Sequence, residues 1–200
     1  MKKTNTFLFF ISFLTFFLAT SCNQQHKKNE EGSVSQSVTA NANAPLTQSA
    51  EELYERLMAS FGDNWMERET DPDLYPDYYG GAFVDNNATL VIAVTGNPEE
   101  NKKRLIEILG TDNFNVESVQ YSYRRMMQVM NSIDAFLMNS AIPENHPLMT
   151  RFAGAYPDVM ENRIKVFLTE TDDATIRLFQ KDIIDSPLII FEQGELPELM

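Results

Sequence analysis

Alternating apolar and polar positions in the middle of the chain predict a β-hairpin. A short strand at 82–84 is followed by the turn residues Asp-Asn-Asn at 85–87, and Leu90, Ile92 and Val94 then share one face of a strand over 89–95. Period-two alternation is typical of a strand with one buried face. Asp and Asn tolerate the backbone of a tight turn, so hairpin geometry explains their position.

Helical spacing and capping residues predict a helix on each side of this hairpin. The first begins at Ser49, where Glu52 completes a capping box, and ends at Gly62. The second begins at Asn97, which precedes a proline and two glutamates, and ends at Gly110.

A further strand and a longer helix are predicted after Gly110. Val119, Tyr121 and Tyr123 alternate, which indicates a strand. Apolar residues then recur at helical spacing over about 125–139, before a segment that contains Pro143 and Pro147. We expect this helix to join two parts of one domain.

The second half of the sequence repeats the first. Residues 80–108 align with residues 153–183, and Asp85 falls on Asp158 at an offset of 73. In the second copy Thr171 is expected to cap the helix. The order hairpin, helix, strand occurs twice, which favours an internal duplication.

These elements define an α+β domain. We expect two repeated β-hairpin–α–β units whose antiparallel sheets are each covered by a helix, joined by the longer helix and preceded by the N-terminal one. The domain spans 49–200, with subdomains at about 75–123 and 152–192 and a closing strand at 188–191.

The N-terminus has the pattern of a bacterial lipoprotein precursor. Lys2 and Lys3 precede an apolar stretch from Phe7 to Leu18, and small residues lead to Cys22, the one cysteine in the chain. The stretch is too short for a transmembrane helix of about 20 residues. We therefore expect residues 1–21 to be a signal peptide, Cys22 to be lipidated, and the protein to be tethered to a membrane of the bacterial cell envelope.

Composition sets limits on the mature protein. Polar residues dominate 22–48, which predicts a disordered tether. Loss of Lys2 and Lys3 leaves 14 basic against 29 acidic side chains, a formal charge of −15. This charge argues against nucleic acid as a partner. Without a second cysteine, the domain is expected to fold without disulfides.

The sequence contains no recognisable catalytic or cofactor motif. Its histidines are His26 in the tether and His146 in a proline-flanked loop, so neither a nucleophilic triad nor a histidine metal site is indicated. The acidic segment 70–73 with Asp77 offers oxygen ligands for calcium but lacks the spacing of an EF-hand. We predict no metal, no cofactor and no enzymatic activity, although a carboxylate-based hydrolase remains an alternative.

Three segments resemble the pro-regions of secreted chymotrypsin-like bacterial serine proteases, of the alpha-lytic protease and streptogrisin type. They are YPDYYGGAFVD at 75–85, TLVIAVTGN at 89–97 and VQYSYRRM at 119–126; residues 154–191 fit the second hairpin unit of those pro-regions.

The resemblance implies a chaperone and inhibitor. In such pro-regions the C-terminal sheet pairs with a hairpin of the protease, and the tail lies in the active-site cleft. Carried over, the strands around 162–169 and 188–191 are the docking sheet and 193–200 the tail. The candidate partner-binding residues are Phe191, Gln193, Leu196, Leu199 and Met200.

The sequence departs from this family because no protease follows Met200 and a lipoprotein signal precedes the domain. We therefore expect a non-enzymatic binding lipoprotein that inhibits or assists a separate secreted serine protease. The alternative is a structural or interaction lipoprotein of the envelope whose partner is a surface protein or a glycan.

Replacement of Cys22 by alanine tests the predicted anchor. Without a thiol to acylate, the Cys22→Ala protein should move from the membrane fraction to the soluble fraction, as measured by immunoblotting after fractionation. A variant that still partitions with membranes would contradict lipidation.

Overall fold

The structure is a computed structural model that describes residues 48–196. It contains two halves, each with one three-stranded sheet and the same order of strands and helices. The first half contains α1 (Ala50–Ala59), α2 (Trp65–Thr70), the short 3-10 helix η1 (Pro72–Leu74), β1 (Tyr79–Val84), β2 (Leu90–Val94), α3 (Pro98–Leu109) and β3 (Asn115–Ser118). The second contains α4 (Tyr123–Leu137), α5 (Pro147–Arg151), β4 (Phe152–Asp158), β5 (Arg163–Leu168), α6 (Asp173–Asp182) and β6 (Ile189–Gln193). The predicted α+β class is confirmed.

The sheets are mixed, whereas the sequence analysis expected them to be antiparallel. β1 and β2 form an antiparallel hairpin, but β3 pairs with β2 in parallel; β4, β5 and β6 repeat this pattern. The reason is the helix between the second and third strands. A chain that leaves a strand, crosses the sheet face as a helix and returns beside the same strand runs parallel to it.

Local signals placed most helix ends correctly. The Ser49 side chain accepts a hydrogen bond from Glu52 N, as the capping box predicts, and Asn97 caps α3. The cap predicted at Thr171 is wrong. Asp172 caps α6 instead, because its carboxylate accepts from both Ala174 N at 2.8 Å and Thr175 N at 2.9 Å.

The strand predicted from Val119, Tyr121 and Tyr123 is also wrong. β3 ends at Ser118, and α4 already begins at Tyr123. Residues 119–122 form a connection, and the rings of Tyr121 and Tyr123 pack between elements, so the alternation does not arise from a strand. Tyr123 lies against the hydrophobic cores of both halves.

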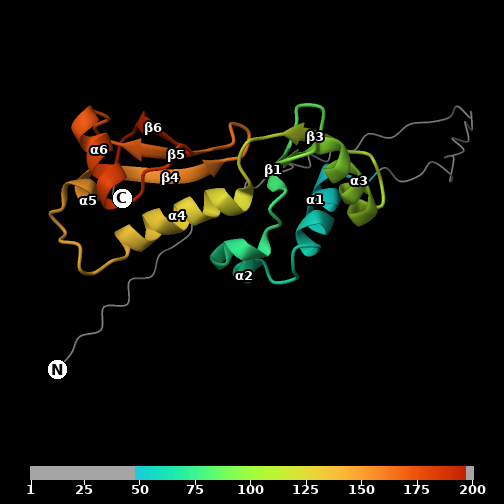
Figure 1. Cartoon of the computed structure of the whole chain (residues 1–200), viewed down its shortest axis with the longest axis horizontal. Coiled ribbons are helices and arrows are strands. Elements are labelled where there is room, and N and C mark those ends of the chain that lie inside the picture. Colours follow the sequence, from blue (N-terminus) through green and yellow to red (C-terminus); the bar gives the residue numbers. More distant parts are fainter. Residues whose placement is uncertain (1–47, 197–200) are drawn as a thin grey trace, which may run out of the picture. The chain divides into compact units, whose positions relative to one another are not determined.

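Helix α4 belongs to the second half and does more than connect the two. Met126, Val129 and Ile133 are buried in the same core as Ile164 and Val166 of β5. Figure 1 shows α4 lying along β4 and β5. It occupies the place that α1 has in the first half, so the repeat includes an initial helix.

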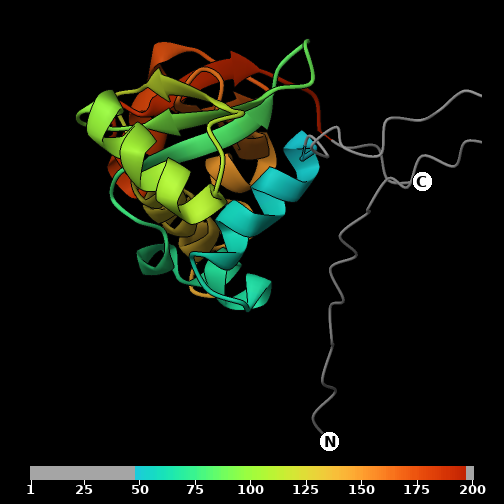
Figure 2. The ribbon, with the colours of Figure 1, turned by 90° about the vertical axis from the view of Figure 1, so that its right-hand side faces the viewer.

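Matching positions confirm this larger repeat. The N-caps Ser49 of α1 and Ser122 of α4 are 73 residues apart, as are the strand irregularities that begin at Tyr79 and Phe152. In the first half, α1 and α3 lie side by side (Figure 2) on the sheet face that carries Leu90, Ile92 and Val94 of β2. Each half therefore buries one sheet face beneath two helices.

Asn162 ties the two halves together. It lies between β4 and β5, is buried and has a left-handed φ of 52°. Its Oδ1 accepts from Tyr121 N at 2.7 Å and its Nδ2 donates to Tyr121 O at 2.8 Å. Nearby, Gly81 of β1 lies so close to Val159 that a Cβ there would be 2.6 Å from a Val159 side-chain carbon.

Arg124 makes a second link, from the start of α4 to the acidic segment of the first half. Its Nε donates to Tyr75 O at 2.8 Å and its Nη2 to Asp73 O at 2.7 Å. Its Nη1 also lies 2.9 Å from a carboxylate oxygen of Asp77. One guanidinium thus fixes the irregular segment that precedes β1.

Substitution of Asn162 measures the strength of this joint. Asn162→Gly removes both bonds to Tyr121 but keeps the backbone relaxed, so we expect a loss of about 1–3 kcal/mol in the free energy of unfolding. Asn162→Ala also strains the left-handed backbone and should cost about 1 kcal/mol more. Urea unfolding followed by circular dichroism provides the measurement.

Ala88→Gly is the matched control, since Ala88 also has a positive φ, 59°, but not this pair of bonds. It should leave stability unchanged or raise it. If both Asn162 variants unfold like the unmodified protein, the joint does not contribute to stability.

Candidate partner-binding surface

The second sheet has two edges, and β6 forms one of them. The strand order is β4-β5-β6, so β5 pairs on both sides. Of the two segments expected to form a docking sheet, 162–169 is therefore central and cannot accept another strand. The segment 188–191, within and next to β6, lies at an edge where a partner strand can be added.

Alternate peptide groups of β6 face this edge. Leu188 O accepts from Ile164 N at 2.8 Å, and Gly194 N donates to Leu168 O at 2.9 Å. Parallel pairing uses every second residue, so the residues between these two positions alternate in direction. The N–H and C=O groups of Phe191 and Gln193 consequently point away from β5.

The other edges are less suitable for pairing. β1 and β4 are each interrupted by a register shift, and β4 also contains Pro157, which has no N–H group. β3 has only four residues, three of them exposed, and carries Glu117. β6 has five residues, is regular and begins with three apolar residues, and its Glu192 is paired with Lys165 of β5. It has fewer of the features that protect edges from pairing.

The predicted partner-binding side chains lie in different environments. The Phe191 ring packs edge-on against Phe179 at a centroid distance of 5.1 Å, so its side chain contacts the core while its backbone faces the edge. Gln193 Nε2 donates to Thr169 O at 3.4 Å. Leu196 is 48% exposed. The remaining predicted residues, Leu199, Met200 and the lipidation candidate Cys22, lie outside the described residues.

A lysine that the sequence analysis missed holds the three strands together. Lys165 of β5 lies 3.4 Å from Asp158 of β4, 2.9 Å from Glu161 and 3.3 Å from Glu192 of β6. The hydrogen bonds that Lys165 donates to these carboxylates, above all to Glu161, raise the pKa of Lys165, so the ammonium stays charged. No sequence motif indicates this site, because two of its carboxylates come from the β4–β5 hairpin and the third from β6.

Residues considered for catalysis or metal binding have structural partners. His146 caps α5 by accepting from Leu148 N at 3.3 Å, and its Nε2 lies 3.3 Å from Asp182. Asp73 and Asp77 pair with Arg124. Within residues 48–196, no three His, Cys, Asp or Glu side chains converge in a way that could hold a metal ion.

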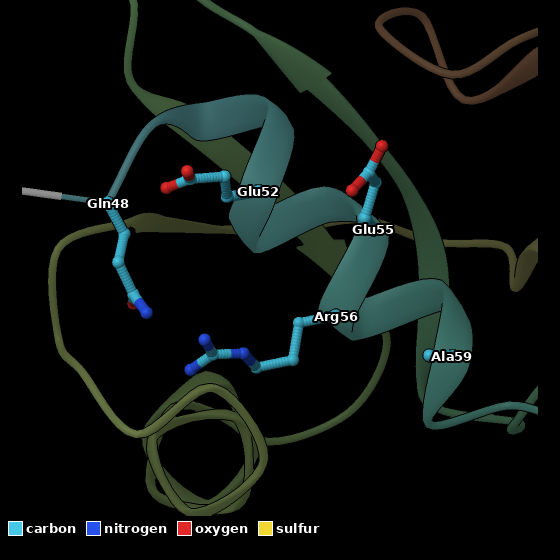
Figure 3. A pocket seen from close by; sticks show the side chains of 5 residues that line it. All are labelled: Gln48, Glu52, Glu55, Arg56 and Ala59. Carbon is cyan, nitrogen blue, oxygen red and sulfur yellow. The ribbon is translucent and has the colours of Figure 1, made fainter.

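A pocket of about 650 Å³ lies beside α1 (Figure 3), and two of its charged lining residues, Glu52 and Arg56, already have structural partners. Glu52 completes the capping box with Ser49. Arg56 donates to Leu109 O at 2.6 Å, at the C-terminal end of α3 where a positive charge is favourable. The bond from Arg56 anchors α1 to α3.

Comparison with known families agrees with the division into two halves. Residues 36–119 match the model of the Pro-like N-terminal domain, and residues 124–194 match that of the Pro-like C-terminal domain. No curated protein matches the chain significantly. In the part of the chain that the structure describes, no helix is both long and apolar enough to cross a membrane. Over residues 36–194 the chain thus consists of a Pro-like N-terminal domain followed by a Pro-like C-terminal domain, a pair of the protease pro-region-like kind.

Proposed function

We propose that this protein is a non-enzymatic binding module that takes an extended segment of a secreted serine protease onto the edge of β6. The outward-facing peptide groups of Phe191 and Gln193 carry this proposal. A partner strand gains affinity from main-chain hydrogen bonds to such an edge. The Pro-like domains and the resemblance to protease pro-regions support a chymotrypsin-like protease as the partner.

The surroundings of β6 favour strand addition because the strand is fixed in place before a partner arrives. Glu192 is held by Lys165, and Phe191 is held by Phe179. A preorganised edge loses less conformational entropy on binding than a mobile one. Partly exposed apolar side chains at Ile189 and Ile190 add surface that pairing would bury.

The segment after β6 is proposed to restrain the protease. It includes the exposed Leu196, which lies in direct continuation of the docking strand. A strand that pairs with the protease surface would direct this segment away from the domain toward the bound enzyme. Inhibition through occupation of the active-site cleft, as the resemblance implies, is the proposed outcome.

We further propose that the module acts at the cell envelope, held to a membrane through lipidated Cys22. Restriction to a membrane raises the local concentration of the module near proteases that cross or leave the envelope. The alternative is an interaction lipoprotein of the envelope. Its partner at the same β6 edge would be another envelope protein and not a protease.

Gln193→Pro tests pairing at the β6 edge. Proline removes the outward N–H of residue 193 and places its ring in the path of a partner strand, but removes no donor to β5. We expect the affinity for a partner protease to fall about tenfold or more. Gln193→Ala is the matched control, because it removes the side chain and keeps the N–H. Thermal unfolding of both variants should agree within about 2 °C.

The binding measurement uses immobilised residues 45–200, which form one compact unit. Native culture fluid and envelope extract are treated with a fluorophosphonate probe that labels active serine hydrolases, before and after capture. Enrichment of a serine protease by the unmodified and Gln193→Ala proteins but not by Gln193→Pro supports the proposal. Equal capture by all three proteins, or capture of envelope proteins alone, contradicts the proposal. A captured protease that reacts with the fluorophosphonate probe as strongly as before capture contradicts inhibition.

A further inference from the structure

A pocket of about 530 Å³ lies between α1 and α2, away from the β6 edge. Its aromatic lining consists of Tyr54, Trp65 and Tyr75. Trp65 is 64% exposed and Tyr54 41% exposed, whereas Tyr75 is buried. Exposed tryptophan and tyrosine rings that border one pocket are typical of binding surfaces.

The pocket carries negative charge. Glu55, Asp63 and Glu69 contribute three carboxylates, and Arg68 contributes one guanidinium. Arg68 donates to Gly62 O, so it is bonded to the loop between the two helices. The wider segment 48–77 contains nine acidic and two basic side chains, a formal charge of −7. A ligand for this site should therefore be positively charged.

The Glu69 carboxylate is close to two of the aromatic side chains. Burial raises the pKa of the Tyr54 and Tyr75 hydroxyls, the negative charge of Glu69 raises both pKa values further, and the positive charge of Arg68 lowers them. Carboxylate and ring face thus border the same space. This combination attracts a cation in two ways, through ion pairing and through the ring quadrupole.

The protein already uses cation–ring contacts elsewhere. Arg104 Cζ lies 4.7 Å from the ring centroid of Tyr78, and Arg163 Cζ lies 4.9 Å from that of Tyr121. Among residues 48–196 these are the cation–ring pairs, and neither involves Tyr54 or Trp65. Among the described residues, therefore, no cation lies over the Tyr54 or Trp65 ring, although Arg68 also lines the pocket.

We propose that the pocket between α1 and α2 binds an arginine or lysine side chain of a protein partner. The aliphatic part of such a side chain would lie against Trp65 and Met58, while its charged end would lie near Glu69 and Tyr54. The site is independent of strand pairing at β6 and gives the protein a second contact surface.

Trp65 is the one tryptophan of the chain, so its fluorescence reports on this pocket alone. Residues 45–200 are titrated with acetyl-Gly-Arg-Gly-amide, with the same peptide containing citrulline, the neutral isostere of arginine, and with the neutral disaccharide cellobiose. The arginine peptide should cause a saturable change with a dissociation constant on the order of 1 mM. The citrulline peptide and cellobiose should cause none.

Variants of the lining assign the response to the proposed contacts. Tyr54→Leu should weaken binding about threefold by removing the ring, while Tyr54→Phe keeps it and should bind normally. Glu69→Gln should also weaken binding about threefold. Glu107→Gln, on the exposed side of α3, is the charge control, and Tyr156→Leu is the control for loss of an exposed ring; both should bind like the unmodified protein.

Amide chemical shifts of Gly62 and Asp63, recorded by NMR in the same titrations, provide a second readout should Trp65 not respond. Saturable shifts with the arginine peptide alone support the proposal. The absence of any response in both readouts overturns it. An equal response to citrulline, or a response to cellobiose instead, also overturns it and assigns the pocket to a neutral ligand.

Discussion

Parallel pairing of β6 with β5 is the interaction on which the candidate partner-binding surface depends. α6 crosses one face of the sheet, so the chain returns beside β5 in the same direction. This return leaves β6 on the outside, and the geometry of parallel bonding turns the peptide groups of Phe191 and Gln193 outwards. The charged contacts of Lys165 with Asp158 and Glu192 then fix all three strands in register.

Much of the fold could be predicted because its signals are local. The capping box at Ser49, the Asn97 cap and the left-handed Gly110 after α3 each depend on residues within four positions. The α+β class, the two hairpins and their common order follow from such signals and from the repeat. Phe191 and Gln193 were predicted from the resemblance as partner-binding residues, and the resemblance did not indicate that their backbone groups face the sheet edge.

The remaining features could not be predicted because they join distant residues. Asn162 bonds to a residue 41 positions away, and Arg124 to one 49 positions away. The helical spacing of apolar residues in α4 also could not show that this helix packs in the core of the second half, because an apolar helix face does not indicate which sheet it will cover. At Tyr121 and Tyr123, alternation that resembles a strand comes from rings packed against separate elements.

The difference between β3 and β6 bears on stoichiometry. Both strands occupy the same position in copies of one topology, yet β3 is short and polar while β6 is longer and begins with apolar residues. A chain with two equivalent open edges could recruit a neighbour at each and grow into a continuous ribbon of molecules. With one such edge, the proposed strand addition would end after a single partner, so association through β6 would yield a pair of fixed composition and would not polymerise.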